Sequence, residues 1–261
     1  RIKQKILRTI KTIIGVKNFI KIFYTNVPTL SSKKFRNWWK DYKKNNKLNY
    51  NLEIMLDDLI KNENFNNYSP YWNYLAQSHI KLLNEKGIEN FKQTIERLHY
   101  WGEGSAHSKL LEPILNDEIT IKYNKEELLK KHEFCLENES REYNKSNLIL
   151  LNFLVNNKYQ EYLDKLEEPN FGKPIFFNYN KKKYSFALLN SIFEIDVLNK
   201  NINLSKFNSI LEIGAGSGRL CSALFQINAN LNYTIVDIPP TLFISQSNLL
   251  NVFKKKKNIQ L

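Results

Sequence analysis

A run of glycines between two acidic residues is the part of this chain whose residue types and spacing could do chemistry. The run lies within Ser209–Pro240, and its glycines are Gly214, Gly216 and Gly218. Glu212 stands two residues before the first glycine, and Asp237 follows the second glycine by 21 residues. Glycine lets a chain turn sharply while its backbone comes close to a ligand. An acid placed like Asp237 accepts hydrogen bonds from ribose hydroxyls, so the pattern predicts a site for a nucleoside-like molecule.

The residues around the glycines predict the elements that must position them. A short apolar run at Ser209–Ile213 predicts a strand, and Tyr233–Val236 predicts a second one. Between them, apolar residues recur at helical spacing, at Leu220, Ala223, Leu224 and Ile227. This order makes a βαβ unit, whose ligand lies at the carboxyl ends of the strands. We expect Pro239 and Pro240 to open a further helix and Asn258–Leu261 to begin a third strand.

The details of the glycine run distinguish between classes of nucleoside ligand. A dinucleotide fingerprint has the spacing G-x-G-x-x-G, and here its third glycine position is Arg219. The observed spacing is E-x-G-x-G-x-G, with an acid before the turn and little provision for a pyrophosphate. Because Glu212 favours a ligand that carries positive charge, the pattern indicates S-adenosyl-L-methionine, which has a sulfonium and an ammonium group and no phosphate.

Two segments carry a more specific resemblance. LEIGAGSGRL followed by YTIVDIPPTLFISQ resembles the class I, Rossmann-like S-adenosylmethionine-dependent methyltransferases. The Asp-Ile-Pro-Pro sequence, with the looser patterns at Ser69–Leu75 and Gly172–Ser185, is similar to the sugar O-methyltransferases of bacterial surface-glycan clusters. The resemblance implies methyl transfer to a hydroxyl of a sugar or glycan acceptor in polysaccharide biosynthesis.

The resemblance also implies roles for individual residues. Glu212 would lie near the amino-acid end of S-adenosylmethionine, Asp237 would hold the ribose hydroxyls, and Ile238 would pack on the adenine. The backbone cradle would consist of Gly214, Ala215, Gly216, Ser217 and Gly218. A His, Asp or Glu would take the proton of the acceptor hydroxyl, and no residue of this sequence is assigned to that catalytic role.

Two alternatives stay open. The first is an NAD(P)-dependent sugar oxidoreductase or epimerase, against which Arg219 argues. The second is an inactive, truncated cofactor-binding partner or scaffold in a glycan-assembly complex. The resemblance implies a seven-stranded, mostly parallel sheet, of which this chain would contain two strands and the start of a third. We therefore expect a C-terminally truncated chain that lacks most acceptor contacts.

The chain divides into four expected parts within an α/β fold. These are a basic amphipathic arm at residues 1–48, a helical accessory or cap region at 49–168, a linker at 169–183, and the first part of the methyltransferase domain at 184–261. Residues 1–48 contain 14 lysines and arginines against one acidic residue, Asp41, whereas the other 213 residues contain 25 of each sign.

Two interpretations of the basic arm stay open. It could pack on the body with a solvated basic face, or it could attach to an anionic membrane with Trp38 and Trp39 at the headgroup level. No nucleic-acid motif accompanies the charge, so no nucleic-acid partner is expected. Cys135 and Cys221 form no CxxC pair, which fits a reducing compartment. The expected location is cytoplasmic, with or without peripheral contact to the inner membrane.

The remaining candidates are weaker. His99, Glu103 and His107 are spaced i, i+4, i+8, but two flanking glycines make a continuous helix and a metal site improbable, and no metal is expected. An aromatic cluster could stack on a sugar ring or belong to the core, and it consists of Tyr68, Tyr71, Trp72 and Tyr74. Tyr184 and Ser185 precede the helix that borders the cofactor pocket in the similar family, so they are candidate lining residues.

Overall fold

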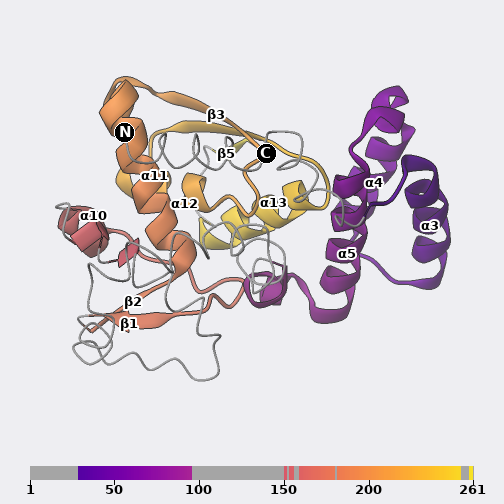
Figure 1. Cartoon of the computed structure of the whole chain (residues 1–261), viewed down its shortest axis with the longest axis horizontal. Helices are drawn as coiled ribbons and strands as arrows, with labels where there is room; N and C mark the ends of the chain where they lie inside the picture. The colour runs from indigo at the N-terminus through magenta and orange to yellow at the C-terminus, as the bar shows by residue number, and fades with distance from the viewer. Residues whose placement is uncertain are drawn as a thin grey trace, which may run out of the picture.

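The fold is mixed α/β, mostly helical, with a small parallel sheet (Figure 1). We describe a computed structural model in which the described residues are 29–95, 150–151, 153–155, 159–179, 181–253 and 259–260. The expectation of an α/β chain with a helical N-terminal region is confirmed at this level. The candidate metal ligands at 99, 103 and 107, the cysteine at 135 and arm residues 1–28 lie outside the described residues.

The N-terminal helices form one packed unit. It consists of α3 (Ser32–Asn45), α4 (Tyr50–Lys61), the 3-10 helix η1 (Glu63–Asn67), α5 (Pro70–Lys86) and the 3-10 helix η2 (Ile88–Asn90). Ser31 and Asn49 cap α3 and α4 by accepting backbone N–H groups. Pro70 occupies the first turn of α5, as its position in the sequence predicts. Ser69, however, makes no capping hydrogen bond with its side chain.

The described part of the basic arm packs on the body. Phe35 and Trp39 of α3 are buried in the same core as Leu52 and Leu56 of α4. The indole N–H of Trp39 donates to Asp57 Oδ1 at 2.8 Å, and Lys43 pairs with the same carboxylate at 2.8 Å. Trp39 is therefore a core residue, so it does not lie at a membrane surface. Residues 32–45 and 50–61 share one core.

A short antiparallel hairpin precedes the sheet. After α10 (Gln160–Lys165), β1 (Phe177–Tyr179) pairs with β2 (Lys182–Tyr184), so a hairpin occupies the end of the segment expected to be a linker and extends one residue past it. The Tyr184 hydroxyl donates to Leu163 O at 3.1 Å, and the Lys182 ammonium donates to the carbonyl of Asp164 at 2.7 Å. These bonds attach the hairpin to α10.

The C-terminal unit contains the predicted βαβ arrangement. Its elements are α11 (Phe186–Ile202), η4 (Leu204–Lys206), β3 (Ser209–Ile213), α12 (Arg219–Ile227), β4 (Asn232–Val236), α13 (Thr241–Val252) and β5 (Ile259–Gln260). The strands are parallel in the order β3-β4-β5, with Ser209 opposite Asn232 and Ile213 opposite Val236. The predicted strand at 209–213, the helix after the glycines, the helix after the prolines and the third strand are all confirmed.

The two faces of this sheet differ. Tyr233 and Ile235 of β4 are buried in a core with residues of α11 and α12, and Cys221 is buried there too. On the opposite face, Ile213 is 78% exposed and Leu211 is 61% exposed. The helices thus cover one face of β3 and β4. Among the described residues, no helix combines the length and the apolar character that crossing a membrane requires.

Candidate functional site at the glycine turn

The glycine run forms a turn at the carboxyl end of β3. Gly214, Gly216 and Gly218 have φ angles of 77°, 63° and 74°, a region that glycine enters readily and other residues rarely adopt. The Gly214 N–H donates to Val236 O at 2.8 Å, which joins the turn to the end of β4. The Gly218 N–H donates to Ala215 O at 3.0 Å and closes the turn before α12. We call residues 212–218 with 237 and 238 the turn site.

The three glycines differ in what surrounds them. A β-carbon added at Gly214 or Gly216 would meet no atom within 4 Å, whereas one at Gly218 would come within 3.2 Å of Leu249. Gly218 therefore packs against α13. Gly214 and Gly216 face open space, which leaves their backbone accessible to a ligand.

Asp237 binds the turn directly. Its Oδ2 accepts the Gly216 N–H at 2.9 Å, and its Oδ1 accepts the N–H of Ile238 at 2.7 Å. Burial raises the pKa of Asp237, while these two backbone hydrogen bonds act in the opposite direction. The structure thus brings together two predicted site residues that lie 21 positions apart. Ile238 is half-buried beside them.

Glu212 lies on the helix-covered side of β3. Its Oε2 accepts the hydroxyl of Tyr233 at 2.8 Å, a partner that the sequence pattern did not reveal. Burial raises the pKa of Glu212, with smaller contributions from the negative charges of Glu194 and Asp237. The hydrogen bond from Tyr233 and the charge of Arg219 oppose this rise. Glu212 is therefore a half-buried carboxyl group near two other carboxyl groups.

Arg219, at the third fingerprint position, points back to α11. Its guanidinium binds both carboxylate oxygens of Glu194, at 2.6 and 2.9 Å, and donates to Ser191 Oγ at 3.0 Å. Glu194 was not among the predicted site residues. The sequence indicated only that it lies on the helix before β3. This pairing largely neutralises Arg219.

Ala215 and Ser217 complete the turn and are buried. The Asn248 amide of α13 donates to Ser217 O at 2.9 Å, which attaches the turn to α13. Asn248 is itself buried, and it is a second residue that sequence reasoning missed. Its role could have been found only from the packing of α13 against the turn.

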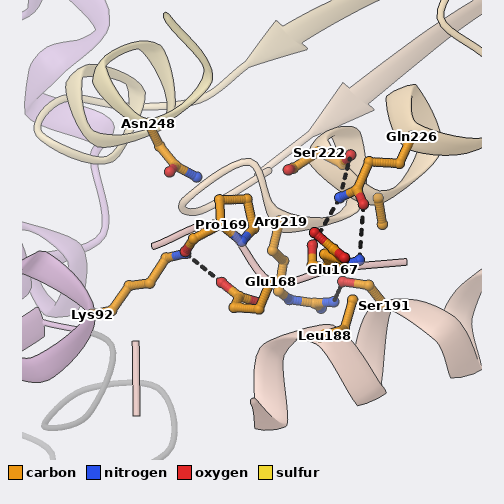
Figure 2. Close-up of a pocket in the computed structure, with 11 residues that line it drawn as sticks. Lys92, Glu167, Glu168, Pro169, Leu188, Ser191, Arg219, Ser222, Gln226 and Asn248 are labelled. Atoms are coloured by element: carbon orange, nitrogen blue, oxygen red, sulfur yellow. Dashed lines mark hydrogen bonds and ion pairs between the residues drawn. The ribbon is translucent and has the colours of Figure 1, made fainter. Parts of the chain in front are cut away.

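A small pocket lies at the junction of the two units, on the inner side of α12 (Figure 2). Lys92 pairs there with Glu168, and both side chains are about 5% exposed. Ser222 Oγ and Asn248 Oδ1 are buried and have no hydrogen-bond partner among the described residues. The volume is about 10 Å³, room for one water molecule. We call it the junction pocket, and its size excludes a substrate.

Other candidate residues have structural roles or lie apart. Ser185 Oγ caps α11 by accepting the Leu188 N–H, and it also donates to Glu168. Ser185 therefore stabilises the junction and the buried Tyr184 attaches the hairpin to α10, so these hydrogen bonds of the two residues are structural. Among the described residues, no group of three or more His, Cys, Asp or Glu side chains is arranged to hold a metal.

The aromatic residues predicted to cluster at 68–74 make separate contacts in the structure. Tyr71 and Trp72 form a ring pair with centroids 5.5 Å apart, and Trp72 is 42% exposed. Tyr68 packs on Phe65 with ring centroids 5.5 Å apart. Burial raises the pKa of Tyr68, and the charge of Asp237 acts in the same direction.

Comparison with known proteins adds no relative to this description: no family model, no curated protein and no solved structure matches the chain.

Proposed function

We propose that the chain binds S-adenosyl-L-methionine in the manner of a class I, Rossmann-like methyltransferase. The observation that carries this proposal is the turn between parallel strands, in which glycines facing open space are bound by the acid that ends the next strand. In the proposed complex, the backbone of 214–218 lies against the ligand and Asp237 accepts the ribose hydroxyls. Each Asp237 oxygen has a further lone pair available for this purpose.

The charge around the turn favours a cationic ligand. Glu212, Glu194 and Asp237 lie close enough for the latter two charges to raise the pKa of Glu212. The charge of Arg219 acts on Glu212 in the opposite direction, but Arg219 is already paired with Glu194. A sulfonium and an ammonium group would relieve this excess of negative charge, whereas a pyrophosphate would add to it. The same argument counts against the NAD(P)-dependent alternative.

The proposed reaction is O-methylation, with a sugar hydroxyl as acceptor on the strength of the sequence resemblance. When bound, S-adenosylmethionine would supply an activated methyl group for direct displacement by that hydroxyl. The chain's own contribution is to hold the nucleoside rigidly, because alignment of the reacting atoms supplies much of the acceleration. The general base is not assigned to any described residue.

A cofactor-binding scaffold is the second candidate. The observation that favours it is the uncovered sheet face with Leu211 and Ile213, since apolar side chains exposed together often mark a protein interface. Methyl transfer from S-adenosylmethionine to a glycan acceptor by this chain would exclude an inactive scaffold. Membrane contact through residues 1–48 stays a proposal, to be tested by flotation with anionic and neutral vesicles.

Binding measurements test the proposed ligand. We expect isothermal titration of the whole chain to detect S-adenosylhomocysteine and to give no signal with NAD. Asp237→Ala should weaken the binding of S-adenosylhomocysteine by about 1.5–3 kcal/mol for each charged hydrogen bond lost. Asp58→Ala is the matched control, because Asp58 is exposed on α4. Equal affinity of wild type and Asp237→Ala would remove Asp237 from the site.

A further inference from the structure

Tyr233 is a buried tyrosine of β4 whose hydroxyl contacts a residue of the turn site. The hydroxyl donates to Glu212 Oε2 at 2.8 Å. Tyr233 is 2% exposed, and its ring packs on Phe225 of α12 with the ring centroids 6.0 Å apart. β3 and β4 pair residue by residue over their whole length, so the donor and the acceptor stand on two joined strands. The fold therefore fixes the direction of the Glu212 carboxylate.

This contact occupies one oxygen of the carboxylate and leaves the other. Burial, followed by the negative charge of Glu212, raises the pKa of Tyr233, so the phenol keeps its proton and remains a donor. In the described part of the chain, no hydrogen bond is made to Oε1 of Glu212. Glu212 is only half-buried, and it precedes Gly214, which faces open space, by two residues. Oε1 is therefore the oxygen available to a ligand.

The neighbouring charges leave the orientation of this carboxylate to Tyr233. The guanidinium of Arg219 is bound by both carboxylate oxygens of Glu194, at 2.6 and 2.9 Å. Glu194 and Asp237 carry the same charge as Glu212 and raise its pKa. A ligand cation would thus meet an oriented carboxylate oxygen, with which it can make a charge-assisted hydrogen bond.

We propose that Tyr233 is a positioning residue, which holds Glu212 so that Oε1 accepts the ammonium group at the amino-acid end of the ligand. Tyr233 contacts the carboxylate and acts through it. This inference rests on the proposed function for the identity of the ligand, and on the 2.8 Å contact for the residue. It implies that the turn site favours a nucleoside with an ammonium group over the same nucleoside without one.

The first experiment compares wild type with Tyr233→Phe by calorimetric titration of two probes. S-adenosylhomocysteine carries the amino-acid end, whereas methylthioadenosine has the same nucleoside and lacks that end. Phenylalanine keeps the ring that packs on Phe225 and removes the hydroxyl. S-adenosylhomocysteine binding should weaken about three- to tenfold, and methylthioadenosine binding should be unchanged. A merely structural role of Tyr233 would weaken both probes.

The matched control is Tyr184→Phe. Tyr184 is also 2% exposed in the same core, and its hydroxyl donates to Leu163 O at 3.1 Å. This variant therefore loses a buried tyrosine hydrogen bond that does not involve the turn site. We expect the affinity of both probes to stay at the wild-type value.

The second experiment needs no variant to fold. Wild-type protein is isotopically labelled at the tyrosine ζ-carbons, and the signal of Tyr233 is followed by NMR spectroscopy during titration. S-adenosylhomocysteine should shift this signal, because its ammonium group changes the charge at the partner of the phenol. Methylthioadenosine should leave the signal in place.

The outcomes separate this inference from the proposed function. If S-adenosylhomocysteine binds but neither Tyr233→Phe nor the Tyr233 signal distinguishes the two probes, the inference is overturned and the proposed function remains. If wild type binds neither probe, the proposed function is overturned and the inference with it. Selective loss of S-adenosylhomocysteine in Tyr233→Phe supports both.

Discussion

At the scale of single residues, burial of the carboxyl groups of the turn site lowers the stability of the fold. Glu212 and Asp237 are both partly buried, and burial raises the pKa of each because the charged form loses solvation. A site that was optimised for stability alone would have a neutral side chain in place of Glu212. Retention of the acid is understandable if a cationic ligand offsets the cost when it binds.

The first prediction concerns Glu212→Gln. Because the folded-state pKa of Glu212 is raised, the wild-type folded state binds more protons than the unfolded state. Its stability should therefore fall as pH rises from about 4, the ordinary pKa of glutamate, through the raised folded-state value. The glutamine variant lacks this fall and keeps an oxygen for the Tyr233 hydroxyl. The difference in urea unfolding free energy, variant minus wild type, should grow with pH across that window.

The control for this prediction is Glu63→Gln. Glu63 is exposed, so its replacement should leave the pH profile of wild type unchanged. The same variants should diverge in binding, with Glu212→Gln losing affinity for S-adenosylmethionine as it gains stability at neutral pH. A Glu212→Gln profile parallel to that of wild type would show that the burial of this carboxyl group costs nothing.

At the scale of elements, the glycines of the turn can be required for two separate reasons. One is the backbone conformation of the turn, and the other is the space that a ligand needs. Gly216→Ala should destabilise the fold by about 1–2 kcal/mol, because alanine is strained at a φ of 63°. Its methyl group would occupy the open space above the turn, so S-adenosylhomocysteine binding should be lost out of proportion to stability. Unfolding free energies and calorimetric titrations check the two effects separately.

The comparison variant for this turn is Gly218→Ala. It has the same kind of strain, with a φ of 74°, but its methyl group would press on Leu249. Gly218→Ala should therefore lose more stability than Gly216→Ala. The Gly218→Ala molecules that do fold should still bind the ligand, because the added methyl group does not occupy the space beside Gly216. Similar binding losses in both variants, at equal folded fractions, would argue against a ligand above Gly216.

The elements around the turn were predictable, and their side-chain partners were not. Alternation and helical spacing are local properties of the sequence, so β3, β4 and the helix between them lie where the pattern indicates. The bond from Tyr233 to Glu212 and the pairing of Arg219 with Glu194 join different elements. A single sequence shows no signal for such pairs. The hairpin at 177–184 likewise lies largely in a segment, 169–183, that was expected only as a linker.

At the scale of the whole molecule, the contacts that join the helical unit to the α/β unit in the described part of the chain include two of different kinds. One is the apolar contact of Phe243 and Ile244 with the helical core. The other is the junction pocket, where Lys92 pairs with Glu168 and also donates to Pro169 O at 3.3 Å. The basic arm shows the same integration, because α3 packs through Phe35 and Trp39 into the unit that meets α13.

The last prediction concerns the ion pair of the junction pocket. Lys92→Met should destabilise the protein by about 3–5 kcal/mol, because it leaves the buried Glu168 carboxylate without its cation. Among the described residues, Glu168 would keep the hydroxyl of Ser185, which donates at 2.7 Å. Urea unfolding, followed by tryptophan fluorescence for the helical unit and by far-ultraviolet circular dichroism for the whole chain, measures the loss.

Two further variants decide what this ion pair does. Lys92→Met combined with Glu168→Leu should recover most of the stability, because no unpaired charge then remains in the pocket. Lys200→Met removes the partner of Asp196 and should cost less stability than Lys92→Met, since the Lys200 side chain is 66% exposed and solvent screens that pair more. If the pair couples the two units, we expect the fluorescence and dichroism transitions to coincide in wild type and to separate in Lys92→Met. Coincident transitions in Lys92→Met would mean that the apolar contact of Phe243 and Ile244 is sufficient to hold the turn site against the helical unit.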